Sequence, residues 1–311
     1  MPRWCMLDPG LDSKNLGDQI ISLHARAQLA NLLDSSDEIT FLPTHRLWSK
    51  EEAQQAKQCT YFIFAGSNVF SHNFPLNFQW VIRPSDLRTL KGKLVFFGVG
   101  AWTYGKFSPI AKWLWSSLLY EGTHSVRDSY SLAKIHQIGK RALNTGCPTL
   151  WGLRDSNQFG HKKSKCVITL TDYRKEPKRD AVWLNLLRHS YDEIYLWPQG
   201  EGDEHYFRSL DLDMTVKVLS RDLESFESIL DARDVDYFGT RLHAGIHALH
   251  RGIRTSIVGI DNRANEMARD FNIPVVTSAS YEQHFERNLL ELRLPRPEIL
   301  SFGEVIRCMQ A

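Results

Sequence analysis

Short apolar runs alternate with amphipathic stretches along most of the chain. The apolar runs, such as residues 61–65, have the length and composition of buried strands, and the stretches between them space apolar side chains as helices do. Regular alternation of this kind predicts an α/β fold with parallel sheets covered by helices on both faces. The expected strands are residues 4–7, 38–42, 61–65, 94–98, 125–127, 142–145, 166–171, 193–197, 215–219, 235–238, 255–259 and 274–277, and the expected helices are residues 17–33, 107–120, 128–138, 181–189, 203–210, 223–232, 241–251 and 263–271.

A polar stretch interrupts this alternation near the middle of the chain. Residues 154–165 include three lysines and show no apolar periodicity, which is typical of a linker. A chain of 311 residues also exceeds what one hydrophobic core usually supports. We therefore predict two Rossmann-like domains, residues 1–157 and 158–311, whose parallel sheets face a central cleft. Ligands of such sheets bind at the carboxyl ends of the strands.

Composition narrows the function classes. The formal net charge is +2, from 38 basic and 36 acidic side chains, whereas a general nucleic-acid binder carries a strong basic excess, so we expect no nucleic acid as a partner. The five cysteines are widely spaced without a Cys-x-x-Cys, which indicates a reducing cytoplasm. No run approaches the roughly 20 apolar residues that span a bilayer, which leaves only peripheral attachment at the inner face of a membrane open. These features do not predict an oligomeric state.

The segment from Asp236 to Ala248 carries the strongest indication of chemistry. Its apolar run stops at Gly239, and Arg241 and His243 follow at the expected start of a helix. Free N–H groups and the helix dipole make such a junction an anion site. An arginine can bind a carboxylate or phosphate through two N–H groups, and a histidine can transfer protons near neutral pH. The alternative is a structural His243 that only caps the turn.

Two further histidines share the helix face of His243. His247 and His250 follow at spacings of four and three, which could form a metal-binding face. The segment lacks the glutamate of a His-Glu-x-x-His motif, and carboxylate ligands are not evident nearby. We therefore predict no metal site, and packing or surface roles for His247 and His250.

Two turns that follow expected strands contain small residues. In the first, Gly17 permits a tight bend, and Asn15 or Asp18 could cap the next helix. In the second, Gly66 and Ser67 would let a ligand approach the backbone. Neither turn contains the glycine pattern of a Walker loop or of a dinucleotide fingerprint. Ordinary turn and cap chemistry also accounts for each of them.

Three polar side chains at other strand ends are further candidates. Arg127 either binds an anion or forms a salt bridge across the domain while Asp128 or Ser129 caps the next helix, and the residues favour neither role. Gln199 could hydrogen-bond a sugar or a phosphate, although an acidic helix start accounts for most of its segment. Arg263 lies at the expected start of a helix, where it is either a second cationic group that binds the ligand or only a surface charge.

These motifs, in this order, resemble the polysaccharide pyruvyl transferase family. The resemblance covers most of the chain, from about residue 13 to residue 275, and its most specific part is Arg241-Leu242-His243. Ala65-Gly66-Ser67 departs from the glycine run that is frequent in the family, and Arg263 replaces a common lysine. The matching segments are residues 15–18, the loop at residue 66, and residues 125–131, 239–243 and 252–263.

The resemblance implies two Rossmann-like domains in a GT-B-like arrangement and a transferase that needs no metal or redox cofactor. The donor would be phosphoenolpyruvate. The acceptor would be a hydroxyl pair on a polysaccharide or on a glycan precursor, either free or lipid-linked, and the product a pyruvate ketal. The C-terminal domain would be the donor side and the N-terminal domain the acceptor side.

The resemblance also implies roles for individual residues. Arg241 matches the family's donor-binding arginine, His243 matches its general acid, and Arg127 matches an arginine near the donor. We add Asp18 as the base that accepts the proton of the acceptor hydroxyl. The remaining expected substrate-binding residues are Asn15, Gly17, Gly66, Ser67, Leu242 and Arg263.

Two other functions fit the same sequence. A glycosyltransferase of this fold would use a nucleotide sugar and would hold its ribose with a carboxylate such as Glu201 or Glu204. A non-catalytic relative would bind glycans or anions without turnover, and the presence of both Arg241 and His243 argues against it. Ligand binding and phosphate release distinguish the three functions.

Overall fold

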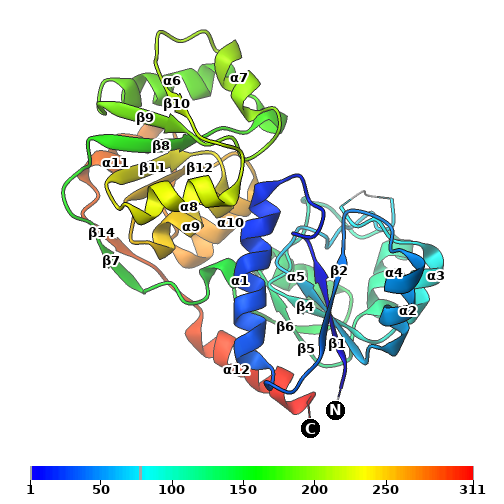
Figure 1. The fold of residues 1–311 in the computed structure, drawn as a ribbon. Helices are drawn as coiled ribbons and strands as arrows, with labels where there is room; N and C mark the ends of the chain where they lie inside the picture. The colour runs from blue at the N-terminus through cyan, green and yellow to red at the C-terminus, as the bar shows by residue number, and fades with distance from the viewer. Residues whose placement is uncertain (1, 77–78, 311) are drawn as a thin grey trace. The chain divides into compact units, whose positions relative to one another are not determined.

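The computed structural model describes residues 2–76 and 79–310 and has an α/β architecture (Figure 1). The chain forms two compact units. Unit 1 comprises Met1–Ser13, Ile21–Trp151 and Leu294–Ala311, and unit 2 comprises Lys14–Ile20 and Gly152–Arg293. The short segment Lys14–Ile20 therefore belongs to unit 2, although it lies near the amino terminus of the sequence.

Unit 1 is built on a parallel sheet with the strand order β2 (Ile39–Pro43), β1 (Trp4–Asp8), β3 (Tyr61–Ala65) and β4 (Leu94–Phe97). Two further parallel strands, β5 (Thr123–Val126) and β6 (Arg141–Asn144), join the end of β4 through a bridge between Val99 and Val126. The helices are α1 (Leu16–Leu32), which begins in unit 2, α2 (Lys50–Gln58), α3 (Pro84–Thr89), α4 (Pro109–Leu118), α5 (Ser129–Gln137) and α12 (Arg296–Cys308).

The sheet of unit 1 has an apolar core on each face, because successive strand side chains point to opposite sides. Met6 packs in a cluster with side chains of α1 and α12, whereas Phe96 packs in another with side chains of α4 and α5. Within the first cluster, Phe302 of α12 stacks on Phe97 with the ring centroids 5.9 Å apart. The C-terminal helix is therefore part of the core of unit 1.

Unit 2 contains a parallel sheet with the strand order β10 (Lys217–Val218), β9 (Glu193–Leu196), β8 (Lys165–Thr169), β11 (Val235–Gly239), β12 (Thr255–Val258) and β13 (Val275–Val276). An antiparallel pair joins β7 (Ser156–Gln158) to β14 (Leu289–Glu291). The helices are α6 (Pro177–Arg188), α7 (Asp203–Ser209), α8 (Leu223–Asp231), α9 (Leu242–His250), α10 (Asn262–Phe271) and α11 (Gln283–Glu286).

Aromatic side chains fix helices to both faces of the sheet of unit 2. Trp183 of α6 stacks on Phe238 at 5.3 Å between ring centroids, and Phe226 of α8 stacks on Trp197 at 3.9 Å. Figure 1 shows α8 and α9 over one face of this sheet. Strand β11 is buried along its whole length and pairs with both β8 and β12. The carboxyl end of β11 therefore lies at the centre of the edge where ligands of parallel sheets bind.

The predicted α/β class with parallel sheets is confirmed, and every expected strand and helix overlaps an observed one. The linker expected at residues 154–165 is wrong in part, because its residues Ser156–Gln158 form β7 and pair with a strand distant in sequence. The sequence predicts one domain boundary after residue 157, whereas the units change after Ser13, Ile20, Trp151 and Arg293. The last change follows from the apolar face of α12, which is buried in unit 1.

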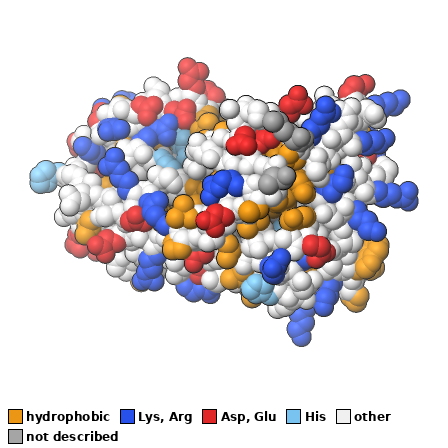
Figure 2. Space-filling view, turned by 90° about the horizontal axis from the view of Figure 1, so that it is seen from below, with side chains coloured by type: hydrophobic (Ala, Val, Ile, Leu, Met, Phe, Trp, Pro, Cys, Tyr) orange, Lys and Arg blue, Asp and Glu red, His pale blue; other side chains and the backbone are white. Residues whose placement is uncertain are grey.

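The surface carries charges of both signs. Figure 2 shows basic and acidic side chains interspersed over the face in view, in keeping with a formal net charge of +2. Within residues 2–76 and 79–310, no helix is both long and apolar enough to cross a membrane.

A buried histidine makes the stability of unit 1 dependent on pH. His124 Nδ1 accepts a hydrogen bond from the Phe96 N–H at 3.2 Å, and its Nε2 lies 3.0 Å from the Tyr120 carbonyl oxygen, to which it donates. Only the neutral ring satisfies both contacts, since a protonated Nδ1 would face another N–H group. Burial lowers the pKa of His124 from 6.5 to about 4.

We expect the free energy of unfolding to fall by roughly 2–3 kcal/mol as the pH decreases from 7 to 4, because the unfolded chain binds the proton first. The contribution is fully present above the unfolded pKa and is lost between it and the folded pKa. Urea titrations across this range should show a smaller pH slope for His124→Gln than for the parent. The exposed His136 supplies the control His136→Gln. An equal slope in the parent and in His124→Gln would show that His124 is not the sensitive group.

Candidate functional site

The junction between β11 and α9 is shaped by the close approach of β8. A Cβ atom on Gly239 would lie 2.2 Å from Thr169 Oγ1 and 2.6 Å from the Thr169 carbonyl oxygen, so only glycine fits at this strand end. The next residue, Thr240, donates its N–H to the Thr169 carbonyl at 3.0 Å and pairs its hydroxyl with Thr171 at 2.8 Å. Arg241 follows as the N-cap residue of α9, where the helix dipole favours anions.

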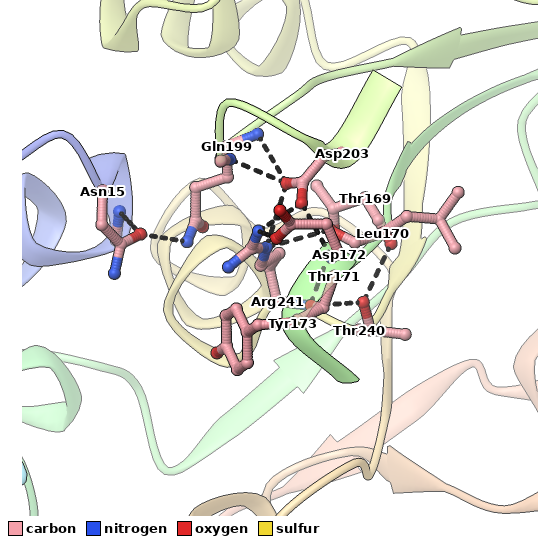
Figure 3. A network of polar contacts seen from close by, with 12 residues as sticks. Asn15, Thr169, Leu170, Thr171, Asp172, Tyr173, Gln199, Asp203, Thr240 and Arg241 are labelled. Atoms are coloured by element: carbon pink, nitrogen blue, oxygen red, sulfur yellow. Dashed lines mark hydrogen bonds and ion pairs between the residues drawn. The ribbon is translucent and has the colours of Figure 1, made fainter. Parts of the chain in front are cut away.

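A buried carboxylate holds the Arg241 side chain. The guanidinium is 4% exposed and donates through Nε and Nη2 to Asp203, whose side chain is fully buried (Figure 3). Nε also donates to the Leu170 carbonyl at 2.9 Å. Burial raises the pKa of Asp203 above its ordinary value, and the charge of Arg241 opposes this shift. Among the described residues, Arg241 Nη1 has no hydrogen-bond partner, so this nitrogen is available to a ligand.

Asp203 also joins two loops at the strand ends. Its Oδ2 accepts from the N–H groups of Gln199 at 3.1 Å and of Gly200 at 2.7 Å, and its Oδ1 accepts from the Asp172 N–H at 3.1 Å. A second carboxylate, that of Asp172, lies 3.6 Å from Arg241 Nη2. One buried side chain thus fixes the loops after β8 and β9 against the arginine that follows β11.

Tyr173 contacts both arginines of the site. Its ring centroid lies 5.2 Å from Arg241 Cζ, and its hydroxyl accepts a hydrogen bond from Arg263 Nη2 at 3.0 Å. Arg263 also donates through Nε to Asp261 Oδ2 at 2.8 Å, while Asp261 Oδ1 caps α10. Within residues 2–76 and 79–310, Nη1 of Arg263 likewise has no hydrogen-bond partner. Each arginine is therefore oriented by a carboxylate.

The turn before α1 belongs to the same part of unit 2. Asn15 Oδ1 accepts from the Gly17 N–H at 3.1 Å, which confirms the predicted cap for Asn15, and from Gln199 Nε2 at 2.9 Å. A Cβ atom on Gly17 would lie 2.6 Å from Gln199 Nε2, so glycine makes room for that side chain. Asp18 lies in the first turn of α1.

A pocket in unit 2 brings most of the sequence candidates together. Its walls come from the turn before α1, the ends of β8 and β9, and the N-terminal turns of α9 and α10. Arg127, Gly66 and Ser67 belong to unit 1 and are not among its lining residues. The sequence candidates that line it are Asn15, Gly17, Asp18, Gln199, Arg241, Leu242, His243 and Arg263.

The three histidines of α9 have different surroundings. His243 lies in the first turn, is 6% exposed and lines the pocket. His247 is buried, contacts Glu227 Oε1 at 2.9 Å, and has its pKa lowered by burial to about 3. His250 lies half-buried in the last turn. The described part of the chain contains no group of three or more His, Cys, Asp or Glu side chains placed to hold a metal ion.

Arg127 forms a separate polar cluster in unit 1. It is 1% exposed and donates through Nε to Asp128 at 3.2 Å and through Nη1 to Asn68 Oδ1. A Cβ atom on Gly100 would lie 2.1 Å from Arg127 Cζ, so this glycine makes room for the guanidinium. Asp128 also caps α5. The ion pair of Arg127 is thus with its sequence neighbour and not across the domain, the expected Asp128 cap is present, and Arg127 Nη2 is buried without a partner among the described residues.

The loop at Gly66 packs closely against other parts of unit 1. Gly66 has φ of 50°, and a Cβ atom there would lie 2.5 Å from Ile21 Cγ2 and 3.5 Å from Pro148 Cδ. A side chain at this position would meet protein atoms, so packing requires glycine here, and the substrate contact expected for Gly66 stays a prediction. The neighbouring Ser67 Oγ is buried and has no partner within the described residues.

Comparison with known proteins identifies the family. The family model described as polysaccharide pyruvyl transferase matches residues 15–262, which is most of the chain. The chain belongs to the polysaccharide pyruvyl transferase family. No curated protein matches it. Among solved structures, the E. coli heptosyltransferase WaaC with ADP-2-deoxy-2-fluoro heptose is similar, with 11% identity over 82% of this chain and 88% of that chain and a TM-score of 0.36.

Two site residues of this pyruvyl transferase family member escape sequence reasoning. Asp203 resembles any acidic residue in the first turn of a helix, and the neighbouring sequence does not indicate that its carboxylate forms an ion pair with Arg241. Tyr173 is half-exposed and carries no motif. One feature of the sequence could have indicated the site, namely Gly200, which lies three residues before Asp203. A Cβ atom at Gly200 would lie 2.6 Å from Arg241 Nη2, so this glycine marks where the arginine approaches the backbone.

Proposed function

We propose that the protein transfers the pyruvyl group of phosphoenolpyruvate to two hydroxyls of a polysaccharide or glycan precursor and forms a pyruvate ketal. The observation that carries this proposal is the pair of oriented arginines, Arg241 and Arg263, whose Nη1 atoms lack partners among the described residues in a pocket that His243 also lines. Phosphoenolpyruvate carries a carboxylate and a phosphate close together, and guanidinium N–H groups suit both. We propose unit 2 as the donor side.

The proposed reaction uses the side chains of this pocket in sequence. His243 donates a proton to the methylene carbon of phosphoenolpyruvate, which makes the carbon that bears the phosphate electron-poor. A sugar hydroxyl forms a bond to that carbon and gives its proton to Asp18. Phosphate leaves with the bridging oxygen, and the second hydroxyl attacks the same carbon and releases its proton as the ketal closes. The sum consumes one phosphoenolpyruvate and one diol and yields one ketal and one phosphate.

The remaining roles complete the proposal. Arg127 in unit 1 would bind substrate through its buried Nη2, with Ser67 beside the same loop, because a buried donor without a partner is costly unless a ligand satisfies it. Asn15, Gly17 and Leu242 would shape the pocket of unit 2. The acceptor would be free or lipid-linked, and the protein would act in the cytoplasm or at the inner face of the membrane. We propose no metal or redox cofactor.

Ligand-induced stabilisation tests the donor. Phosphoenolpyruvate at about 100 times its Kd should stabilise the native state by roughly 2.7 kcal/mol and raise the melting temperature. A panel of nucleotide sugars should leave the melting temperature unchanged. If a nucleotide sugar raised the melting temperature and phosphoenolpyruvate did not, the protein would be a glycosyltransferase instead. Binding of phosphoenolpyruvate without phosphate release, across a broad acceptor panel, would indicate a non-catalytic relative.

A further inference from the structure

Gln199 presents a buried acceptor to the pocket of unit 2. Its side chain is 4% exposed and lines the pocket. Its Oε1 atom is buried and has no hydrogen-bond partner within residues 2–76 and 79–310. Buried side-chain oxygens are nearly always hydrogen-bonded, and an unmet one costs about 1–3 kcal/mol. A hydrogen-bond acceptor without a partner in a residue that lines a pocket indicates a ligand that supplies the hydrogen-bond donor.

The surrounding contacts fix which end of the Gln199 amide faces Asn15 and which end is left without a partner among the described residues. Asn15 Oδ1 accepts from the backbone N–H of Gly17, so this atom of Asn15 must be the oxygen. Because that oxygen is an acceptor, Gln199 must turn its NH₂ group toward it, and the two atoms lie 2.9 Å apart (Figure 3). A flipped Gln199 amide would place two oxygens against each other. The backbone N–H of Gly17 therefore fixes the Asn15 amide, which in turn fixes the Gln199 amide with its oxygen, Oε1, directed away from Asn15.

The donor substrate does not satisfy this acceptor. Near neutral pH the carboxylate and phosphate oxygens of phosphoenolpyruvate are chiefly acceptors, which suit the Nη1 atoms of Arg241 and Arg263 but not Gln199 Oε1. A sugar hydroxyl has the hydrogen that the amide oxygen needs. We propose that Gln199 is a specificity-determining residue that accepts a hydrogen bond from a ligand hydroxyl beside the bound anion. This inference rests on the proposed function in that the hydroxyl would belong to the sugar acceptor.

Two matched pairs of small anions test the inference without a known acceptor. The first pair is 2-phosphoglycerate and 2-phospholactate, and the second is 3-phosphoglycerate and 3-phosphooxypropanoate; in each pair only the first compound has a hydroxyl. Calorimetry with the full chain should show that the hydroxyl improves the Kd by about 3- to 10-fold in at least one pair. In Gln199→Met the preference for the hydroxylated compound should disappear, because only that compound binds more weakly. The Kd of phosphoenolpyruvate should stay within about twofold of the parent value.

Two further variants separate this role from a structural one. Gly17→Ala should reduce the same preference, because the added Cβ atom displaces the Gln199 amide without removing it. Gln283→Met changes an exposed glutamine of unit 2 and should leave every Kd unchanged. Thermal melts verify that each variant folds.

The outcomes distinguish this inference from the proposed function. No hydroxyl preference in either pair, or equal weakening of both members and of phosphoenolpyruvate in Gln199→Met, would overturn the role of Gln199. A hydroxyl preference that depends on Gln199, in a protein that does not bind phosphoenolpyruvate, would support the role of Gln199 and reject the proposed donor.

Discussion

Replacing His243 by glutamine is expected to lower turnover of phosphoenolpyruvate by about 10²–10⁴-fold, because the proposed reaction loses its positioned proton donor. The Kd of phosphoenolpyruvate should stay within a few-fold of the parent value, since the proposal assigns anion binding to the arginines and not to the histidine. Glutamine is preferred to alanine because His243 is 6% exposed, and a smaller side chain would leave a cavity. Phosphate release measures turnover, and calorimetry measures binding.

The exposed His205 of α7 supplies the matched control. His205→Gln should turn over like the parent. Parent-like turnover in His243→Gln would remove His243 from proton transfer. Loss of binding together with turnover would make it a binding residue instead.

The second large effect is expected on stability, at the pair formed by Arg241 and Asp203. Removing one partner of a buried pair typically costs about 3–5 kcal/mol. Arg241→Ala leaves Asp203 as a buried charge without its cation, whereas Asp203→Ala leaves Arg241 with only the longer, 3.6 Å contact to Asp172. The double variant should lose much less than the sum of the two single losses, because no unpaired charge remains. Denaturant titrations measure the four free energies of unfolding. Additive losses would show that the two side chains do not depend on each other.

An exposed ion pair on the same helix as Asp203 provides the control for this cycle. Arg208 and Glu204 of α7 lie 2.7 Å apart and are 66% and 39% exposed, so Arg208→Ala should cost at most about 0.5 kcal/mol. Arg241→Lys separates binding from stability. A lysine keeps a charge for Asp203 but cannot also reach a ligand through a second nitrogen, so the Kd of phosphoenolpyruvate should rise by roughly tenfold.

The elements of the fold were predictable wherever their signal is local. Strands such as β3 and β11 are apolar runs that end at small residues, and both lie where the sequence predicts them. The pairing of β7 with β14 was not predictable, because each strand is short and its partner is distant in sequence. The packing of α12 in unit 1 was not predictable either. No helix was expected at residues 296–308, and the packing of Phe302 on Phe97 shows that α12 belongs to the core of unit 1.

The candidate site divides in the same way. Arg241 and His243 were found because a cation and a proton donor directly after a buried strand are typical of an anion site, and the pocket of unit 2 includes both. Asp203 was missed because a helix start is an ordinary place for a carboxylate, and its full burial depends on loops from two other strands. The roles of these residues in catalysis stay predictions.

Phosphate release coupled to product analysis tests the proposed reaction most directly. The purified protein, phosphoenolpyruvate labelled with ¹³C at the carbon that bears the phosphate, and a panel of glycan acceptors are incubated together. The proposed reaction predicts one phosphate released for each labelled pyruvyl group that appears on an acceptor as a ketal carbon in the NMR spectrum. Transfer of a sugar from a nucleotide donor, with no consumption of phosphoenolpyruvate, would contradict it.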